Sequence, residues 1–221
     1  MRLLAFDTAG EACSAALWQD GRVVSHRRAA MARGHAEALI PMVGTVLAEA
    51  DAAFATLDAL AVTTGPGSFT GLRVGLAAAR GFALALKLPV IGVGTLEALA
   101  EATPEEERAG RSVIAALDAR RGEIYWQAFD AGLHPLSAPA VAPAAAIEVP
   151  GGALLLVGSG AAALAAAGER AGRELRLSAA PASPDAAFVA TLAARRKESA
   201  GPGTALRPLY LRAAAAEAPP P

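Results

Sequence analysis

The chain has 221 residues and a formal net charge of −1, and its residues are 54% hydrophobic but only 5% aromatic. This length allows one large or two small domains with a substantial core. The near-neutral charge argues against a protein that binds nucleic acid on its own, because such proteins need a basic surface. The single cysteine excludes an internal disulfide.

The first 30 residues predict an antiparallel meander of three strands. Apolar runs cover residues 2–6, 12–18 and 22–28, and the turn signal Asp20-Gly21 separates the last two. The first run is short and ends at Asp7, so we expect no signal peptide and a cytoplasmic location. A helix is expected over 34–50, kinked or restarted at Pro41, and a buried strand over 57–63.

A glycine-rich turn, GPGSFTG from Gly65 to Gly71, opens the helix expected over about 70–87. One face of this helix is apolar, a second is made mostly of small residues, and a third is basic. The apolar face holds Leu72, Leu76, Ala79, Ala83 and Leu86, the small face Gly71, Gly75, Ala78 and Phe82, and the basic row Arg73, Arg80 and Lys87. A surface helix normally has a single apolar stripe, so this one is expected to pack on two sides.

The next elements complete a βββ-α-β-α-β-α order, which predicts a mixed sheet with helices on its faces. A buried strand covers 90–93, and Thr95 is expected to cap a helix over 96–102. The charged segment 103–107 marks a boundary, which gives domains of 1–102 and 103–212. The tail, 213–221, is expected to be disordered.

The second half repeats the opening pattern in reduced form. A strand over 112–117 leads to Asp118, a turn and a strand over 123–129, as the first strand leads to Asp7 and the second strand. The uncharged window 151–168 is interpreted as a strand, a turn and a helix rather than a membrane span. Residues 135–150 and 179–185 are expected to be loops.

Six stretches together resemble the bacterial TsaB (YeaZ) family. They are LLAFDTAGEACSAALW from Leu3, HAEALIPM from His35, GPGSFTGLRVGLAAARG from Gly65, PVIGVGTLEAL from Pro89, LDARRGEIYW from Leu117 and PLYLR from Pro208. The resemblance implies an α/β fold of the actin, heat-shock-chaperone and sugar-kinase (ASKHA) type with two RNase H-like lobes. It also implies an accessory role in making threonylcarbamoyladenosine (t6A) at position 37 of tRNAs that read ANN codons.

The resemblance implies partners as well. In that family the catalytic subunit is a paralogue, TsaD, which the accessory subunit binds, and an ATPase, TsaE, joins them. We therefore expect a non-catalytic subunit with a degenerate active site, no tightly bound cofactor, and ATP and tRNA only in the complex. Without its partner the chain is expected to form a homodimer.

The paralogue carries two histidines four residues apart, a spacing that suits a metal ion. The corresponding positions here are Thr95 and Leu99, and leucine has no ligand atom. The three histidines of the chain, His26, His35 and His134, form no pair at ligand spacing. The sequence therefore predicts no metal site.

Four residues are candidates for facing a nucleotide or phosphate: Asp7, Thr8, Ser68 and Thr70. The favoured alternative is local, with Asp7 and Thr8 bonding their own turn and Ser68 or Thr70 capping the helix. Glu11 places a negative charge where a phosphate would lie, and no lysine follows the glycines at Walker spacing. The loop is therefore expected mainly to set up the helix for packing.

Seven residues are predicted to bind a partner: His35, Leu39, Gly71, Arg73, Gly75, Ala78 and Phe82. The alternative for His35 is a hydrogen bond at the start of its helix. Asp118, Arg120 and Arg121 either contact tRNA or a partner, or pair with Glu123 across their turn. Two rival functions are an ATP-dependent phosphotransferase that uses Asp7, and a peptidase, for which no nucleophile is evident because Cys13 is expected to be buried.

Overall fold

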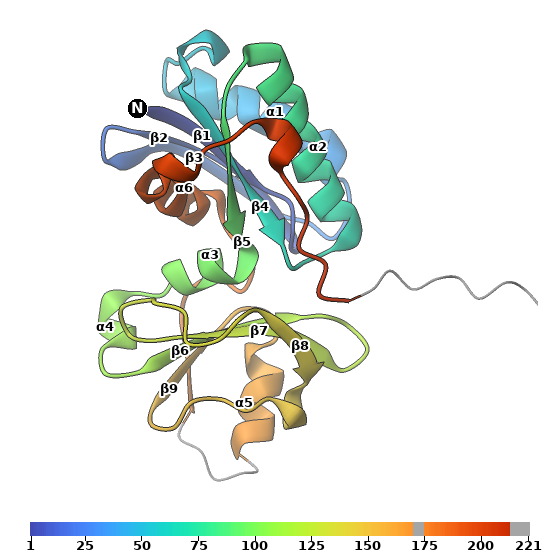
Figure 1. Ribbon diagram of the computed structural model, residues 1–221, viewed down its shortest axis with the longest axis vertical. Helices are drawn as coiled ribbons and strands as arrows, with labels where there is room; N and C mark the ends of the chain where they lie inside the picture. Colours follow the sequence, from blue (N-terminus) through green and yellow to red (C-terminus); the bar gives the residue numbers. More distant parts are fainter. Residues whose placement is uncertain (170–174, 213–221) are drawn as a thin grey trace, which may run out of the picture.

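The computed structural model, which describes residues 1–169 and 175–212, has two lobes stacked along the long axis of the molecule, each built on a five-stranded sheet (Figure 1). The strands of the first lobe are β1 (Arg2–Asp7), β2 (Ala12–Gln19), β3 (Arg22–Ala30), β4 (Ala59–Gly65) and β5 (Val90–Gly94). Those of the second lobe are β6 (Ser112–Asp118), β7 (Glu123–Phe129), β8 (Ala140–Pro143), β9 (Leu154–Val157) and β10 (Leu175–Leu177).

The two sheets have the same topology. The strand order is β3-β2-β1-β4-β5 in one and β8-β7-β6-β9-β10 in the other. In each, an antiparallel meander is followed by two strands that run parallel to its first strand. The predicted meander, the mixed sheets, the echo between the halves and the two-lobe α/β fold are confirmed.

Helices cover the sheets. They are α1 (His35–Glu49), α2 (Phe69–Leu86), α3 (Thr95–Glu101), α4 (Glu105–Arg108), α5 (Ala161–Glu169) and α6 (Ala186–Arg195). Short 3-10 turns occur at Phe54–Thr56, Ala144–Ala146, Lys197–Ser199 and Gly203–Ala205. The helix α1 runs through Pro41 without a break.

The first sheet is buried on both faces. On one face, α1 and α2 pack Leu39, Val43 and Leu76 against Phe6 and Leu4. On the other face, α6 packs against β1 and β2, although it lies far away in the sequence. The proposed boundary near residue 103 separates the two sheets, but residues 186–195 return to the first lobe, which the division 103–212 does not anticipate.

The second sheet packs α3 on one face and α5 on the other, so α3 lies between the lobes (Figure 1). Burial of Leu96 and Leu99 of α3 among Val113, Leu117 and Leu155 joins the lobes through a shared apolar core. The two lobes therefore share a substantial junction.

The structure corrects two local predictions and adds one helix that was not expected from the sequence. Thr95 does not cap α3: it is the first helical residue and is buried, while the side chain of Glu97 accepts a hydrogen bond from the Gly94 N–H at 3.0 Å. Residues 135–150 are not all loop, because they contain β8. The helix α6 was not predicted at all, and the expected disordered tail at 213–221 lies outside the described residues.

Among the described residues, α2 alone is long and apolar enough to cross a bilayer by length and composition. One third of it is buried (33%), and its inner face packs on the sheet beside β4, as that of a core helix does. The remaining apolar surface of α2 faces outward.

Candidate functional site

The carboxyl ends of β1, β4 and β5 meet at the edge of the first sheet that faces the second lobe (Figure 1). In open α/β sheets this edge is where ligands bind. It carries Asp7 at the end of β1 and the glycine-rich loop after β4, so it brings together the four residues predicted to face a nucleotide.

Asp7 is fully buried. Its Oδ1 accepts hydrogen bonds from Thr63 Oγ1 at 2.5 Å and from the Ala9 N–H at 3.2 Å, while Oδ2 has no hydrogen-bond partner among the described residues. Burial raises the pKa of the Asp7 carboxyl to about 6, against the hydrogen bonds from Thr63 and Ala9, which lower it. Asp7 thus accepts a hydrogen bond from its own turn, as the local alternative predicts, and its role toward a nucleotide stays a prediction.

Thr8 points to α2 rather than into the cleft. Its Oγ1 donates to the Gly71 carbonyl at 2.7 Å. The glycines of the loop allow this close approach: a Cβ on Gly71 would collide with the Thr8 carbonyl oxygen, and one on Gly67 would lie 2.6 Å from the Ala9 carbonyl oxygen. The backbone of the turn after β1 therefore packs directly against the backbone of the loop after β4, because the glycines have no side chains to separate them.

The side chain of Ser68 caps the start of α2. Ser68 Oγ accepts from the Gly71 N–H at 3.2 Å, and the Ser68 N–H donates to the Ala9 carbonyl at 2.8 Å. Thr70 is exposed and makes no side-chain hydrogen bond among the described residues. The backbone N–H groups of Ser68 and Gly71, which could otherwise bind a phosphate, thus already donate to groups of the chain itself. This supports a packing role for the loop.

The residues predicted to bind a partner fall into two groups. Leu39, Gly71 and Gly75 lie inside the first lobe, and Ala78 and Phe82 pack partly into its core. A Cβ on Gly75 would lie 2.7 Å from Thr8 Oγ1. The small-residue face of α2 therefore contacts the chain's own sheet, which corrects the expectation that it contacts a partner.

The other two residues lie nearer the surface. Arg73 is exposed, with its guanidinium 3.7 Å from the centre of the Phe69 ring. His35 Nε2 lies 3.1 Å from the Gly10 carbonyl oxygen, so His35 fastens α1 to the turn after β1 rather than bonding its own helix.

A different set of small and apolar side chains is exposed on α1 and α2, and sequence reasoning missed it. On α1 these residues recur every four positions: Ala36, Ile40, Gly44 and Ala48. On α2 they are Ala77, Gly81, Leu84 and Ala85. Ile40 is 51% exposed and Leu84 84%, and nothing lies within 4 Å of a Cβ built on Gly44 or Gly81. We call these eight residues the outer stripes. The four-residue spacing on α1, on the face beside its buried stripe, was the available signal.

The turn between β6 and β7 joins the lobes electrostatically. Arg120 lies 2.5 Å from Glu11 of the first lobe and also pairs with Asp118. Glu123 pairs with Arg212 near the end of the described chain, so the predicted alternative of a pair between the turn arginines and Glu123 is wrong. Arg121 forms no ion pair among the described residues.

A second buried carboxylate holds α6 in place. Asp185 caps α6 through the Ala187 N–H at 2.9 Å, and its oxygens lie 2.7 Å from His26 Nε2 and 3.6 Å from Arg28 Nε on β3. Burial raises the pKa of Asp185, but the hydrogen bonds from His26 and Ala187 and the charges of His26 and Arg28 outweigh it and keep the pKa below its usual value. No local pattern in the sequence pointed to this cluster.

Two further sequence-derived expectations concern nucleophiles and metals. Cys13 is buried in β2, as expected, and burial raises the pKa of its thiol to about 11, which keeps it protonated. Within residues 1–169 and 175–212, no three His, Cys, Asp or Glu side chains come together as a metal site would require. The lack of a metal in the protein stays a prediction.

Comparison with known proteins identifies relatives. A family model described as TsaD, tRNA N6-adenosine threonylcarbamoyltransferase, matches residues 26–218. The chain is 48% identical over 126 residues to the tRNA threonylcarbamoyladenosine biosynthesis protein TsaB of Escherichia coli (strain K12), which covers 57% of this chain and 54% of that protein. An uncharacterized protein of Mycobacterium bovis is 40% identical over 159 residues, which cover 71% of this chain and 72% of the relative.

The solved structure of YeaZ from Pseudomonas aeruginosa superposes with a TM-score of 0.84 at 33% identity and covers 95% of this chain and 99% of that one. In sequence, the chain spans about half the length of the first curated relatives that it matches, 54% and 52%. The structural match nevertheless extends over both lobes.

Proposed function

Because the chain belongs to the TsaB (YeaZ) family, we propose that it is a non-catalytic subunit required for t6A formation at position 37 of ANN-decoding tRNAs, and that it acts by binding and activating a TsaD-like paralogue. A TsaE-like ATPase joins the assembly, and ATP is bound only there. Without its partner the chain forms a homodimer.

The observation that carries this proposal is the pair of outer stripes. A helix that buries only one side and exposes alanines, glycines and a leucine on the other offers a surface on which a partner helix can approach closely. Because Gly44 and Gly81 have open space around them, the surface has room to receive side chains of a partner. A specific interface needs roughly 800 Å² per partner, which two helices can supply.

The activation step is a shift of population rather than chemistry supplied by this chain. A partner that binds the active arrangement of the paralogue more tightly raises the fraction of molecules in that arrangement. The side chains of Thr8, Ser68 and Asp7 form hydrogen bonds within the chain, and these bonds support this assignment.

Gly81→Leu and Gly44→Leu test the proposal directly. Each adds a bulky side chain to an outer stripe without a clash in the monomer, and leucine favours helix more than glycine does. We expect both variants to fold, to lose association with the TsaD-like subunit in a co-purification assay, and to abolish t6A in a reconstituted system read by mass spectrometry of tRNA nucleosides.

The matched control is Gly151→Leu, in an exposed segment of the second lobe where a Cβ also meets nothing within 4 Å. It should assemble and support modification like the unmodified chain. Full assembly and activity of the Gly44 and Gly81 variants would show that the outer stripes are not the interface. ATP turnover or peptide hydrolysis by the isolated chain would favour the rival enzymatic functions.

A further inference from the structure

Two exposed aromatic rings lie in contact where α2 begins. Phe69 is 44% exposed and Tyr210 43%, with ring centres 5.4 Å apart and planes inclined by 38°. The other aromatic side chains of the described residues are buried or half-buried. The guanidinium of Arg73 lies over the Phe69 ring, so the pair combines two π-faces with a cation.

Tyr210 belongs to a segment that is fixed at both ends. We call residues 206–212 the strap. The Leu206 carbonyl accepts from Arg80 at 2.8 Å, and the Leu209 N–H donates to the Thr64 carbonyl at 2.7 Å. Beyond Tyr210, Arg212 donates to the Ala119 carbonyl at 3.1 Å and pairs with Glu123 of the second lobe. The exposed ring is therefore held in position rather than left to move with a loose end.

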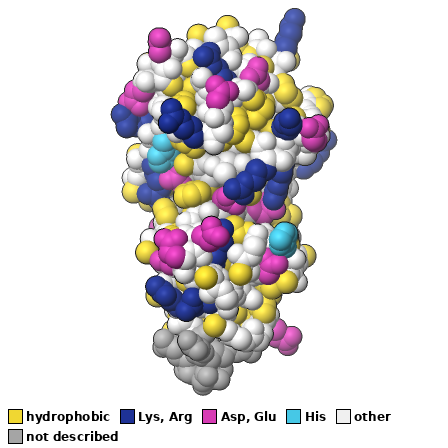
Figure 2. Space-filling model, turned by 90° about the vertical axis from the view of Figure 1, so that its left-hand side faces the viewer, with side chains coloured by type: hydrophobic (Ala, Val, Ile, Leu, Met, Phe, Trp, Pro, Cys, Tyr) yellow, Lys and Arg dark blue, Asp and Glu magenta, His cyan; other side chains and the backbone are white. Residues whose placement is uncertain are grey.

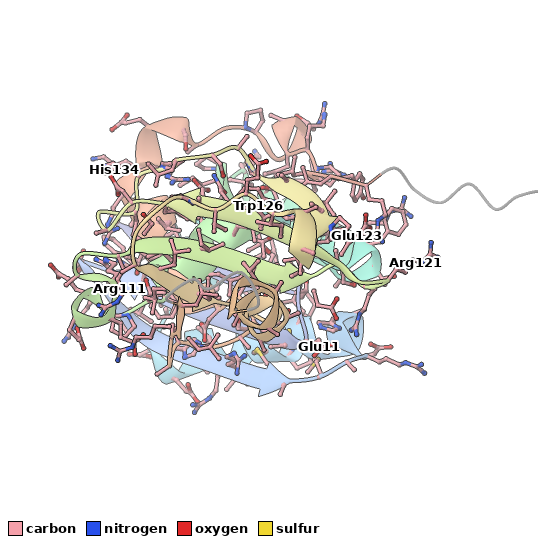
Figure 3. All side chains as sticks on the ribbon, turned by 90° about the horizontal axis from the view of Figure 1, so that it is seen from below. Glu11, Arg111, Arg121, Glu123, Trp126 and His134 are labelled. Atoms are coloured by element: carbon pink, nitrogen blue, oxygen red, sulfur yellow. The ribbon has the colours of Figure 1, made fainter. Side chains whose placement is uncertain are left out.

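Three exposed arginines belong to the strap or to elements that contact it. Arg73 lies over the Phe69 ring, Arg207 is part of the strap, and Arg121 lies in the β6–β7 turn, whose Glu123 pairs with Arg212 of the strap. None of the three forms an ion pair among the described residues, although one nitrogen of Arg207 donates to the Thr204 and Leu206 carbonyls. Two carboxylates of this region are already paired, Glu123 with Arg212 and Glu11 with Arg120. Arg121 lies at the same edge of the molecule as Glu123 and projects outward (Figure 3).

The opposite side of the molecule differs. Near the end of α6, Arg195 pairs with Glu101 and Arg196 with Glu97, both at 2.8 Å. On that side, basic and acidic side chains are interspersed over both lobes (Figure 2). Exposed arginines without an ion pair also occur elsewhere in the described residues, at Arg22, Arg33 and Arg176, but only at the strap does one lie against exposed aromatic rings.

We propose that the Phe69–Tyr210 pair is a stacking surface for an unpaired base of the tRNA substrate, with Arg73, Arg121 and Arg207 contacting the adjacent phosphates. This rests on the proposed function, which makes tRNA the substrate of the assembly. Unpaired RNA bases stack on tyrosine, phenylalanine and arginine, and flanking guanidinium groups bind the backbone. The charge complementarity favours RNA over a protein partner at this surface.

The test forms the complex of this chain with the TsaD-like subunit and measures its affinity for tRNA by fluorescence anisotropy at several salt concentrations. Tyr210→Leu keeps an apolar side chain but removes the ring, and should weaken binding by about 5- to 150-fold. Tyr210→Phe should bind like the unmodified chain. Arg121→Gln should weaken binding and lower the salt-dependence slope by about one. Leu136→Ala, at a 52% exposed side chain of the second lobe, is the control.

Assembly is measured separately by gel filtration and calorimetry, and folding by thermal denaturation. The expected result is intact assembly and folding with weakened tRNA binding in Tyr210→Leu. Loss of assembly would assign the rings to the protein partner and overturn the proposal, as would an unchanged tRNA affinity. Binding of AMP to the unmodified chain in calorimetry that is lost in Tyr210→Leu, with unaltered tRNA binding, would assign them to a free nucleotide instead. A wild-type complex that binds tRNA but makes no t6A would contradict the proposed function and leave the affinity test of the rings in force.

Discussion

The two lobes have the same strand order, but the aspartate that ends the first strand is buried in one and exposed in the other. Asp7 at the end of β1 is fully buried, whereas the side chain of Asp118 at the end of β6 is 46% exposed. Asp118 accepts a hydrogen bond from the Arg120 N–H at 2.7 Å and pairs with that arginine. One carboxylate therefore belongs to the interior and the other to a surface turn.

The loops that follow the fourth strands are alike. In the first lobe the Ser68 N–H donates to the Ala9 carbonyl at 2.8 Å, and in the second the Gly160 N–H donates to the Ala116 carbonyl at 2.9 Å. Gly65 and Gly158 both have left-handed φ, +117° and +106°, which favours glycine. In both lobes this loop therefore bonds to the chain near the end of the first strand, but at different positions: Ala9 lies two residues after Asp7, and Ala116 two residues before Asp118.

What differs is the covering of each sheet. The helix α1 connects β3 to β4 in the first lobe, where the second lobe has the 3-10 turn Ala144–Ala146 between β8 and β9. The helices α3, after β5, and α6, after β10, correspond, and each packs on the sheet of the other lobe. The comparison indicates that the shared topology fixes the order of strands and helices, and that α1, the outer stripes and the strap, which belong to one lobe, create surfaces available to partners. Substitutions at Gly75, Asp185, Asp7 and Arg121, each with a control, test this comparison.

The largest effect is expected on α2. Gly75→Leu forces a side chain against Thr8 and Val62 and should lower the free energy of unfolding by about 3 kcal/mol. Gly81→Leu on the outer side of the same helix should be neutral or stabilise by up to about 1 kcal/mol. Urea denaturation of both variants measures the difference, and equal destabilisation would contradict the one-sided packing of α2.

The second effect concerns α6, which follows β10 and packs on the first sheet, as α3 follows β5 and packs on the second. Asp185→Ala removes the helix cap and leaves His26 and Arg28 without their buried carboxylate, so we expect a loss of about 2 to 3 kcal/mol at neutral pH. Asp185→Asn should retain the cap and lose less. Because the pKa of Asp185 is lowered in the folded state, its stabilisation is present above the unfolded-state pKa and is lost as pH falls through the folded-state value. Stability curves against pH that stay parallel down to strongly acidic conditions would refute this.

The third effect concerns Asp7, whose contribution to stability depends on pH in the opposite direction to that of Asp185. The pKa of Asp7 rises from 3.8 to about 6 on folding, so the folded state holds its proton more tightly. The contribution of Asp7 to stability is therefore greatest below pH 4 and falls by about 2 to 3 kcal/mol as pH rises through 6. Asp7→Asn should remove this dependence and be more stable than the unmodified chain at pH 7. Urea denaturation of the unmodified chain and of Asp7→Asn between pH 4 and 7.5 tests this prediction. If the two proteins show the same dependence of stability on pH, the pKa of Asp7 is not raised by burial.

The same variant sharpens the functional comparison. In the reconstituted system, Asp7→Asn and Asp7→Ala should reduce t6A formation far less than Gly81→Leu does. Loss of activity with intact complex formation would mean that Asp7 takes part in nucleotide chemistry, and the accessory-subunit proposal would be wrong.

The smallest effect is expected at the turn between β6 and β7. Arg121 has φ +58°, a left-handed conformation that disfavours arginine. Arg121→Gly should raise the free energy of unfolding by a few tenths to about 1 kcal/mol while weakening tRNA binding by the complex. Lys87→Gly, at φ +56° at the end of α2, is the matched control and should stabilise without changing tRNA affinity. Equal losses of affinity in both variants would mean that the total positive charge, and not the position of Arg121, determines tRNA binding.

Much of the fold was predictable because its signals are local. Apolar runs, the Asp20-Gly21 turn and the periodicity of residues 70–87 depend on neighbours within a few positions, and the meander, β4, α2 and the β6–β7 hairpin follow from them. The short strand β8 was missed because Pro and Ala dominate residues 135–150 and give no alternating pattern. The helix α6 was missed although its residues are apolar and periodic.

The candidate site was only partly predictable. Motifs and local patterns were sufficient to predict the two-lobe α/β fold, the family and the burial of Cys13, and they left the cap of α2 open between Ser68 and Thr70, of which the structure shows Ser68. Which side of α2 is free could be seen only once the chain had folded. Gly75 and Gly81 are the same residue type on the same helix, yet one meets Thr8 and the other meets nothing within 4 Å. Folding also brought Asp185 to His26 and Tyr210 to Phe69, residues separated by more than one hundred positions, and contacts at that separation leave no local pattern in a single sequence.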